Sequence, residues 1–171
     1  VQGKFPSQLD LPTGLGKTSV MVIWLVARAL ADDEALKRIP RRLVYIVDRR
    51  AVVDQATAEA EKLRDALDGG AAHLKTRLRL DDKQLPISTL RGSLVDNRKW
   101  LDDPSVPAIV IGTVDKTGSR IVFEGYDVPP KMRAFHAGLI GVDALIVLDE
   151  AHLVPPFTKL LQSIQNDPSL W

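Results

Sequence analysis

The sequence predicts an α/β fold in which a mostly parallel sheet carries helices on both faces. Short apolar runs, most of them rich in valine and isoleucine, alternate with longer segments of helical periodicity. Strands that are covered on both faces have this nearly unbroken hydrophobicity, whereas half-exposed strands alternate apolar with polar residues. The runs that we expect to form strands are residues 8–11, 43–47, 86–90, 108–112 and 144–148.

Two long helices are expected between these strands. Residues 18–30 are strongly apolar, and a second set of apolar residues recurs at helical spacing further along the chain. Gly69 and Gly70 follow this second set and are expected to end its helix. The set comprises Val52, Val53, Ala56, Ala60, Leu63 and Leu67.

Three stretches are less regular. We expect a charged connection over 32–40 and a loop with at most a short element over 68–85. The stretch 117–131 includes Ile121–Glu124 and Pro129-Pro130, which suggests a small hairpin at the edge of the sheet.

Composition restricts the class of protein. The chain has 171 residues, 45% of them hydrophobic and 26% charged, which suits one globular domain with a sizeable core. The net charge of +1 argues neither for nor against a polyanionic partner such as nucleic acid. Any such contact must come from local clusters of basic residues. The absence of cysteine excludes disulfides and thiolate metal sites. The longest apolar run, 20–27, is too short to span a bilayer, and we expect no membrane partner.

A glycine-rich motif that ends in Lys17 and Thr18 predicts a site for nucleotide phosphates. Such a turn aims backbone N–H groups into one concavity, and the following helix adds the positive end of its dipole. Lys17 can reach the terminal phosphates and the Thr18 hydroxyl can bind Mg²⁺. Leu11 stands where the strict pattern has glycine. The alternative is a turn that merely caps a helix. The expected ATP-binding residues are Thr13, Gly14, Leu15, Gly16, Lys17, Thr18 and Ser19.

A second motif, Asp149-Glu150-Ala151-His152, follows the last expected strand. Asp149 can hold Mg²⁺ opposite Thr18, and Glu150 can polarise the attacking water as a general base. We therefore expect ATP and Mg²⁺ as cofactors, with Lys17, Asp149 and Glu150 as catalytic residues. The alternative is an acidic pair that caps the next helix. His152 either couples nucleotide state to a polynucleotide or is a hydrogen-bonded histidine at a helix start.

The two motifs together resemble those of superfamily 2 helicases of the DEAH type, whose motor has two RecA-like P-loop NTPase lobes. Further segments are similar to the CRISPR-associated helicase-nuclease of type I systems, above all its type I-U (I-G) branch. These segments are IVDRRAVVDQ, STLRGS, PAIVIGTVDKTGSR and MRAFHAGLIGVDALIVLDEAHLVPPF. The resemblance implies that residues 1–171 form a single first RecA-like lobe.

The resemblance also implies a surface that grips the backbone of single-stranded DNA. Most of its residues follow expected strand ends, where arginine and hydroxyl donors can share a rim with the ATP site. Ser93 replaces the second glycine of the family's arginine-glycine-glycine turn. The alternative for each arginine is a solvated surface charge, and we assign Lys75, Arg77 and Arg79 to that class. The expected DNA contacts are Arg49, Arg50, Arg91, Gly92, Thr113 and Asp115.

Trp24 and Trp100 are expected to be core or helix-packing residues rather than platforms on which bases stack.

The implied activity is that of an ATP-dependent 3′→5′ translocase or helicase on single-stranded DNA, acting in CRISPR type I interference in the prokaryotic cytoplasm. The implied partners are a second RecA-like lobe, a nuclease domain and an RNA-guided surveillance complex. Because the second lobe supplies the arginine fingers, we expect this segment alone to hydrolyse ATP negligibly. The alternatives are an RNA helicase or restriction-type translocase, and a non-catalytic DNA-binding or docking module. Intact Lys17, Thr18, Asp149 and Glu150 argue against the last.

Overall fold

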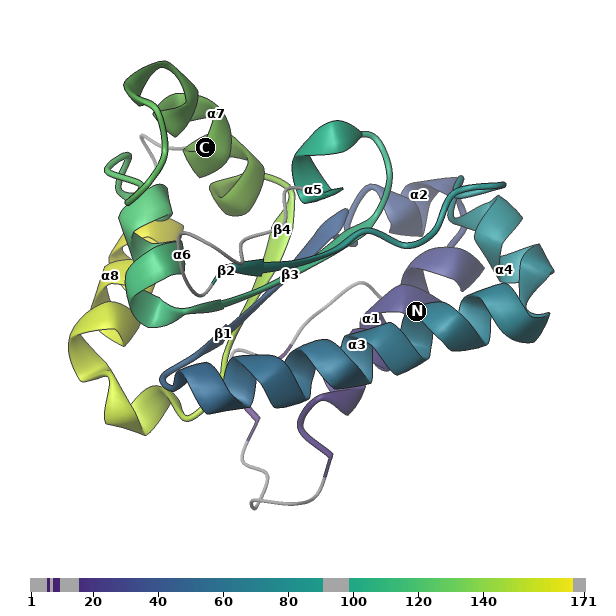
Figure 1. Ribbon diagram of the computed structural model, residues 1–171, viewed down its shortest axis with the longest axis horizontal. Coiled ribbons are helices and arrows are strands. Elements are labelled where there is room, and N and C mark those ends of the chain that lie inside the picture. The colour runs from purple at the N-terminus through teal and green to yellow at the C-terminus, as the bar shows by residue number, and fades with distance from the viewer. Residues whose placement is uncertain (1–5, 7, 10–15, 91–98, 168–171) are drawn as a thin grey trace.

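A four-stranded parallel sheet forms the centre of the molecule (Figure 1). The computed structural model describes residues 6, 8, 9, 16–90 and 99–167. The sheet has the order β2-β3-β1-β4, and each neighbouring pair of strands is parallel. This confirms the expected fold class. The strands are β1 (Arg42–Val47), β2 (Ile87–Leu90), β3 (Ala108–Thr113) and β4 (Ala144–Leu148).

The strands differ in burial, and position in the sheet alone does not decide it, because the edge strand β2 is buried throughout. β1 and β3 lie inside the sheet and are buried along their whole length, whereas the edge strand β4 is half-buried throughout. Four of the five expected strands are confirmed. Of the fifth, Gln8 and Leu9 belong to neither a helix nor a strand, and Asp10 and Leu11 lie outside the described residues.

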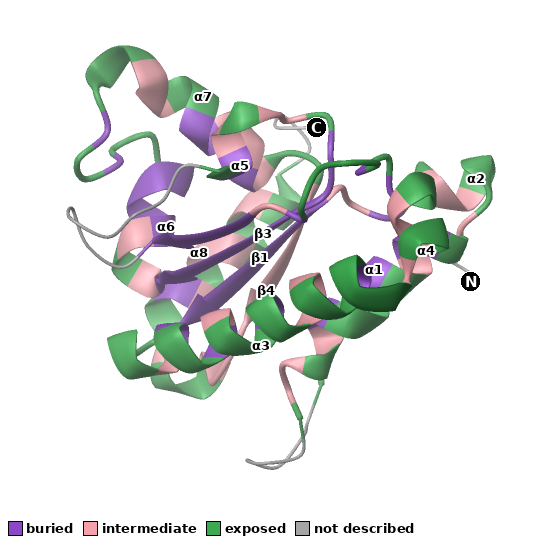
Figure 2. Ribbon diagram, turned by 45° about the vertical axis from the view of Figure 1, so that its right-hand side comes forward, coloured by how far each residue is buried: buried purple, intermediate pink, exposed green. Residues whose placement is uncertain are grey.

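Helices cover both faces of the sheet, as Figures 1 and 2 show. Alternate residues of β1 point to opposite faces: Tyr45 packs toward α1, α3 and α4, and Ile46 packs toward α5, α6, α7 and α8. Among the described helices, none is both long and apolar enough to cross a membrane. The helices are α1 (Ser19–Leu30), α2 (Asp33–Leu36), α3 (Arg50–Gly70), α4 (Ala72–Arg77), α5 (Lys99–Asp102), α6 (Val114–Ile121), α7 (Pro130–Gly141) and α8 (Pro155–Asn166), with a short 3₁₀ turn η1 (Ala151–Leu153).

The two long helices expected from periodicity are confirmed. α1 begins one residue later than expected, and α3 ends at Gly70. Trp24 and Trp100 are both buried, as expected of core residues. The indole N–H of Trp24 donates to the carbonyl of Pro40 at 2.8 Å, so its one polar atom is satisfied inside the core.

The expectation of a hairpin around 121–124 is wrong. α6 extends through Ile121, and a turn then leads to α7. The physical reason is the close approach of α6 to β3. A methyl group added at Gly112 would lie 2.5 Å from the Thr117 hydroxyl, so only glycine admits the helix at this distance.

The other two irregular stretches contain short helices. The charged connection 32–40 includes the one-turn helix α2, and α4 is the short element expected within 68–85. Lys75 of α4 pairs with Asp68 of α3 at 2.8 Å, and Arg77 donates to the carbonyl of Ala29. Lys75 is therefore half-buried, whereas Arg77 is exposed, as expected, although it also links α4 to α1.

Arg42 anchors the amino-terminal end of the sheet. Its buried guanidinium donates to the carbonyls of Leu139 at 2.6 Å, Val142 at 3.0 Å and Pro104 at 3.2 Å. Burial lowers the pKa of Arg42, an effect that the nearby Asp143 carboxylate opposes. One cation therefore ties the end of α7 and the segment after α5 to the start of β1.

Replacing Arg42 by methionine is expected to lower the free energy of unfolding by about 3 kcal/mol, because buried carbonyls lose a charged donor. Urea unfolding followed by circular dichroism measures this change. The control is Arg38→Met, since Arg38 is exposed. Equal stability of the two variants would contradict the anchoring role of Arg42.

Candidate nucleotide site

The carboxyl ends of β1, β3 and β4 lie level with one another. Val47 of β1 pairs with Thr113 of β3, and Ile46 pairs with Leu148 of β4. Asp149 extends the sheet by one hydrogen bond, because its N–H donates to the Ile46 carbonyl at 2.9 Å. The residues that follow these strands therefore share one edge, which is where ligands bind in open α/β sheets.

The end of the phosphate motif leads directly into α1. Gly16 has φ +71°, a conformation that L side chains rarely adopt, and its carbonyl accepts the Ser19 N–H at 2.8 Å. Thr18 is half-buried and makes no side-chain cap to α1, so its hydroxyl is not used by the helix. This is the geometry of an anion site at a helix amino terminus. The expected phosphate-binding residues Thr13, Gly14 and Leu15 lie outside the described residues.

Lys17 brings the two motifs together. Its ammonium group donates to Glu150 Oε1 and lies 3.5 Å from Asp149 Oδ1. The hydrogen bond to Glu150 is the largest of the influences that raise the pKa of Lys17; burial opposes it, and the Asp149 charge adds to it. Residues 133 positions apart in the sequence thus form one charged cluster. The structure thus brings Lys17 and the acidic motif together, although it describes no strand before the phosphate motif.

Asp149 is held on both of its carboxylate oxygens. The phenol of Tyr45 donates to Oδ2 at 2.8 Å, and the Glu150 N–H donates to Oδ1 at 2.9 Å. Glu150 itself has φ 51° and ψ 43°, a left-handed conformation that costs a residue with a side chain of order 1 kcal/mol or more. Such strain is concentrated at functional sites.

Sequence reasoning did not single out Tyr45. The available signal was its hydroxyl, the single polar side-chain atom in an otherwise aliphatic strand, LVYIV. A buried tyrosine hydroxyl normally has a hydrogen-bond partner, and at the second position before a strand's end that partner can belong to the site.

The donors at this edge suit Mg²⁺. Asp149 and Thr18 supply carboxylate and hydroxyl oxygens, the hard ligands that Mg²⁺ prefers. No group of three or more histidine, cysteine, aspartate or glutamate residues that could hold a metal occurs in the described part of the chain. Mg²⁺ in nucleotide sites needs no such cage, since it keeps waters and binds the phosphates through one or two protein oxygens.

The expected DNA contacts that the structure describes flank the same edge. Arg49 and Arg50 are exposed where β1 gives way to α3, and Arg49 lies 3.8 Å from the Asp48 carboxylate. Thr113 is buried at the end of β3, and Asp115 is exposed in the first turn of α6. Arg91 and Gly92 lie outside the described residues.

His152 lies beside this cluster. Its side chain is 71% exposed, and Nδ1 is 3.5 Å from Glu150 Oε2. An exposed imidazole therefore contacts the residue expected to act as general base.

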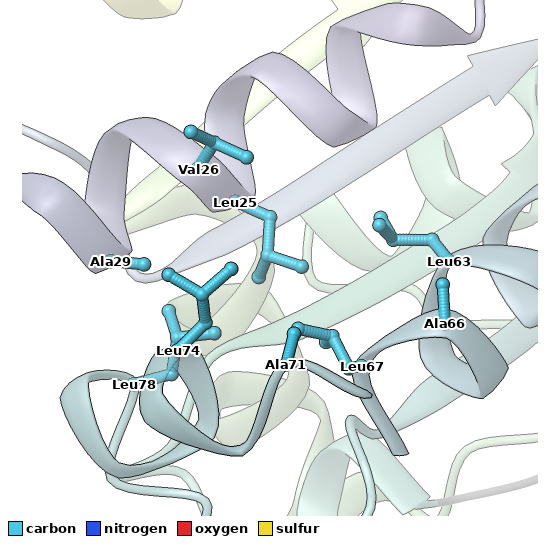
Figure 3. Close-up of a pocket in the computed structure, with 9 residues that line it drawn as sticks. All are labelled: Leu25, Val26, Ala29, Leu63, Ala66, Leu67, Ala71, Leu74 and Leu78. Carbon is cyan, nitrogen blue, oxygen red and sulfur yellow. The ribbon is translucent and has the colours of Figure 1, made fainter. Parts of the chain in front are cut away.

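A separate cavity of about 120 Å³ lies between α1, α3 and α4 (Figure 3). Its nine lining residues are all leucine, valine or alanine, including Leu25, Leu63 and Leu74. It offers no group that could bind phosphate or a cation, so the charged edge is the better candidate for the functional site.

Comparison with known proteins gives the family. Residues 2–167 match the family described as type III restriction enzyme, res subunit. The chain belongs to this family. It is a superfamily 2 helicase-like RecA lobe, and its class of activity is that of an ATP-dependent motor. Comparisons with curated proteins and with solved structures gave no match. The family assignment does not reach the CRISPR-associated branch that the sequence resembles.

Replacing Glu150 by glutamine is expected to lower the pKa of Lys17, because the ammonium loses a charged acceptor. The contact with Glu150 stabilises the folded state below the ordinary lysine pKa, and this contribution is lost as pH rises through the raised value. NMR titration of the lysine side-chain signals measures the shift. Glu34→Gln, which breaks an exposed pair with Lys37, is the control. A Lys17 pKa unaffected by Glu150→Gln would contradict the contact.

Proposed function

We propose that this lobe binds Mg-ATP and the backbone of single-stranded DNA as the first motor lobe of a helicase or translocase in CRISPR type I interference. The observation that carries the proposal is the contact of Lys17 with both Asp149 and Glu150. A phosphate-binding lysine and the two carboxylates of a metal-phosphate clamp then occupy one edge of the sheet. The resemblance to the type I-U (I-G) helicase-nuclease supports the narrower assignment.

The chain's own residues would act as follows. When ATP binds, the Lys17 ammonium group would leave the Glu150 carboxylate and contact the terminal phosphates, which are negatively charged as well. Glu150, released from Lys17, orients the attacking water and accepts its proton. Thr18 and Asp149 would hold Mg²⁺, which neutralises charge on the phosphates when bound. Thr13, Gly14, Leu15, Gly16 and Ser19 would contribute the phosphate cradle around them.

The DNA contacts would lie on the rim beside this edge. Arg49 and Arg50 are exposed there and can pair with phosphates without reading sequence. Arg91, Gly92, Thr113 and Asp115 complete the proposed surface. His152, in contact with Glu150, is proposed to couple nucleotide state to the polynucleotide. The proposed partners are a second RecA-like lobe, a nuclease domain and an RNA-guided surveillance complex.

A second candidate is a restriction-type translocase that moves along double-stranded DNA. The description of the matching family, the res subunit of a type III restriction enzyme, favours it. Both candidates use the same ATP chemistry, so only the nucleic acid that stimulates hydrolysis separates them.

The deciding experiment is the Mg²⁺-dependent ATPase rate of the full-length protein with single-stranded DNA, single-stranded RNA, double-stranded DNA or no nucleic acid. We expect stimulation by single-stranded DNA and a loss of about 10²–10³ in kcat for Lys17→Ala, which removes a cation from the transferring phosphoryl group. Lys37→Ala is the control, since Lys37 is 69% exposed in the turn that ends α2.

Each alternative predicts a different pattern. Stimulation mainly by double-stranded DNA would favour the restriction-type translocase, and stimulation mainly by RNA an RNA helicase. A rate that ignores nucleic acid and tolerates Lys17→Ala would contradict the motor assignment. The 171-residue segment alone is proposed to show negligible turnover.

The double variant Arg49→Ala, Arg50→Ala is expected to weaken binding to single-stranded DNA with little dependence on its sequence. The slope of log affinity against log salt should become shallower by about 0.7 for each phosphate that the variant no longer neutralises. Fluorescence anisotropy over a salt series measures it, with Arg79→Ala as a control at an exposed position outside the rim. An unchanged slope would remove these two arginines from the DNA surface.

A further inference from the structure

We infer that Tyr45 is a positioning residue for the magnesium-binding carboxylate: its phenol holds one carboxylate oxygen of Asp149 and so keeps the other oxygen aimed at the nucleotide. This inference rests on the proposed function and assigns a role to a residue of β1 that no phosphate-loop or acidic motif contains. The evidence is the register of two strands, the separate occupants of the two carboxylate oxygens, and the burial of the phenol.

Strand register brings Tyr45 to Asp149. Tyr45 pairs with Val147 across the β1–β4 ladder, and both pack into the same core cluster beneath α1 and α3. Asp149 follows Val147 by two residues and therefore starts out on that same face of the sheet. The phenol ring extends along the strand toward the carboxyl edge and ends with its hydroxyl 2.8 Å from Asp149 Oδ2.

The two oxygens of Asp149 have different surroundings. Oδ2 accepts the Tyr45 hydroxyl, whereas Oδ1 accepts the Glu150 N–H and lies 3.5 Å from Lys17 Nζ. Oδ1 is thus the oxygen on the side of the phosphate motif. A hydrogen bond to Oδ2 fixes the plane of the carboxylate about its Cβ–Cγ bond, so that the other oxygen stays directed toward the phosphate motif.

The importance of Tyr45 increases when ATP arrives. Once Lys17 turns to the phosphates, the Tyr45 hydroxyl is the side-chain donor to Asp149 that remains in the described part of the chain. Tyr45 is 1% exposed, so water cannot readily replace its hydroxyl if it is removed.

The test compares Tyr45→Phe with Tyr126→Phe in the full-length protein. The chain has two tyrosines, and Tyr126 is exposed on the turn between α6 and α7, so the second variant makes the same chemical change away from the site. Binding of a fluorescent, non-hydrolysable ATP analogue is titrated with Mg²⁺, and repeated in EDTA. Measurements are made well below the melting temperature of each variant, so that lost core stability does not enter.

For Tyr45→Phe we expect the Mg²⁺ concentration at half-saturation to rise about tenfold, the lower end of the loss usual when the partner of a metal ligand is removed. Affinity in EDTA should be unchanged, and Tyr126→Phe should match the wild type. A Mg²⁺ concentration at half-saturation within twofold of the wild-type value would overturn the inference. An equal loss of nucleotide affinity with and without Mg²⁺ would also overturn it, because it would indicate a general distortion of the site. If the wild type shows no Mg²⁺-dependent, Lys17-dependent binding, the proposed function fails and this inference fails with it.

Discussion

β1 and β4 pair in parallel from Arg42↔Ala144 to Ile46↔Leu148, and the Asp149 N–H adds one more bond to the Ile46 carbonyl. The site depends on this ladder. Because the strands are parallel and in register, Asp149 and Glu150 emerge at the edge where β1 gives way to Asp48 and Arg49. The same register places Tyr45 two residues behind Asp149 on a shared face. A slip by one residue would turn each of these side chains to the other face of the sheet.

The second constraint is electrostatic. Two adjacent carboxylates at a strand end repel each other, and Lys17 compensates them from the start of α1. In the proposed function, the phosphates of ATP would draw Lys17 away from the two carboxylates, and Mg²⁺ would take its place at Asp149. Glu150 has a left-handed backbone conformation. The hydrogen bond from its N–H to Asp149 Oδ1 stabilises this turn. Strain and charge thus meet at the residue proposed to activate water.

The errors of sequence reasoning are instructive. The short stretch 121–124, with two prolines after it at 129 and 130, suggested a hairpin, yet α6 continues through Ile121. Contacts between residues far apart in the sequence decide this. Gly112 lets α6 approach β3, and Phe157 of α8 lies against Gly118. Likewise, the sequence could not reveal that Lys75 is half-buried against Asp68 of α3, because this contact exists only once the helices are placed.

The sequence by itself determined the fold class, four of the strands, the long helices and the two motifs, because these depend on periodicity and on short local patterns. It also predicted that Lys17 and the pair Asp149-Glu150 would share an edge, since the carboxyl ends of parallel strands meet there. Only the tertiary structure decided which side chain holds which oxygen. From the sequence alone, Tyr45 is one more core residue in LVYIV. Its hydrogen bond joins residues 104 positions apart, and neither local sequence predicts it before β1 and β4 are placed in register.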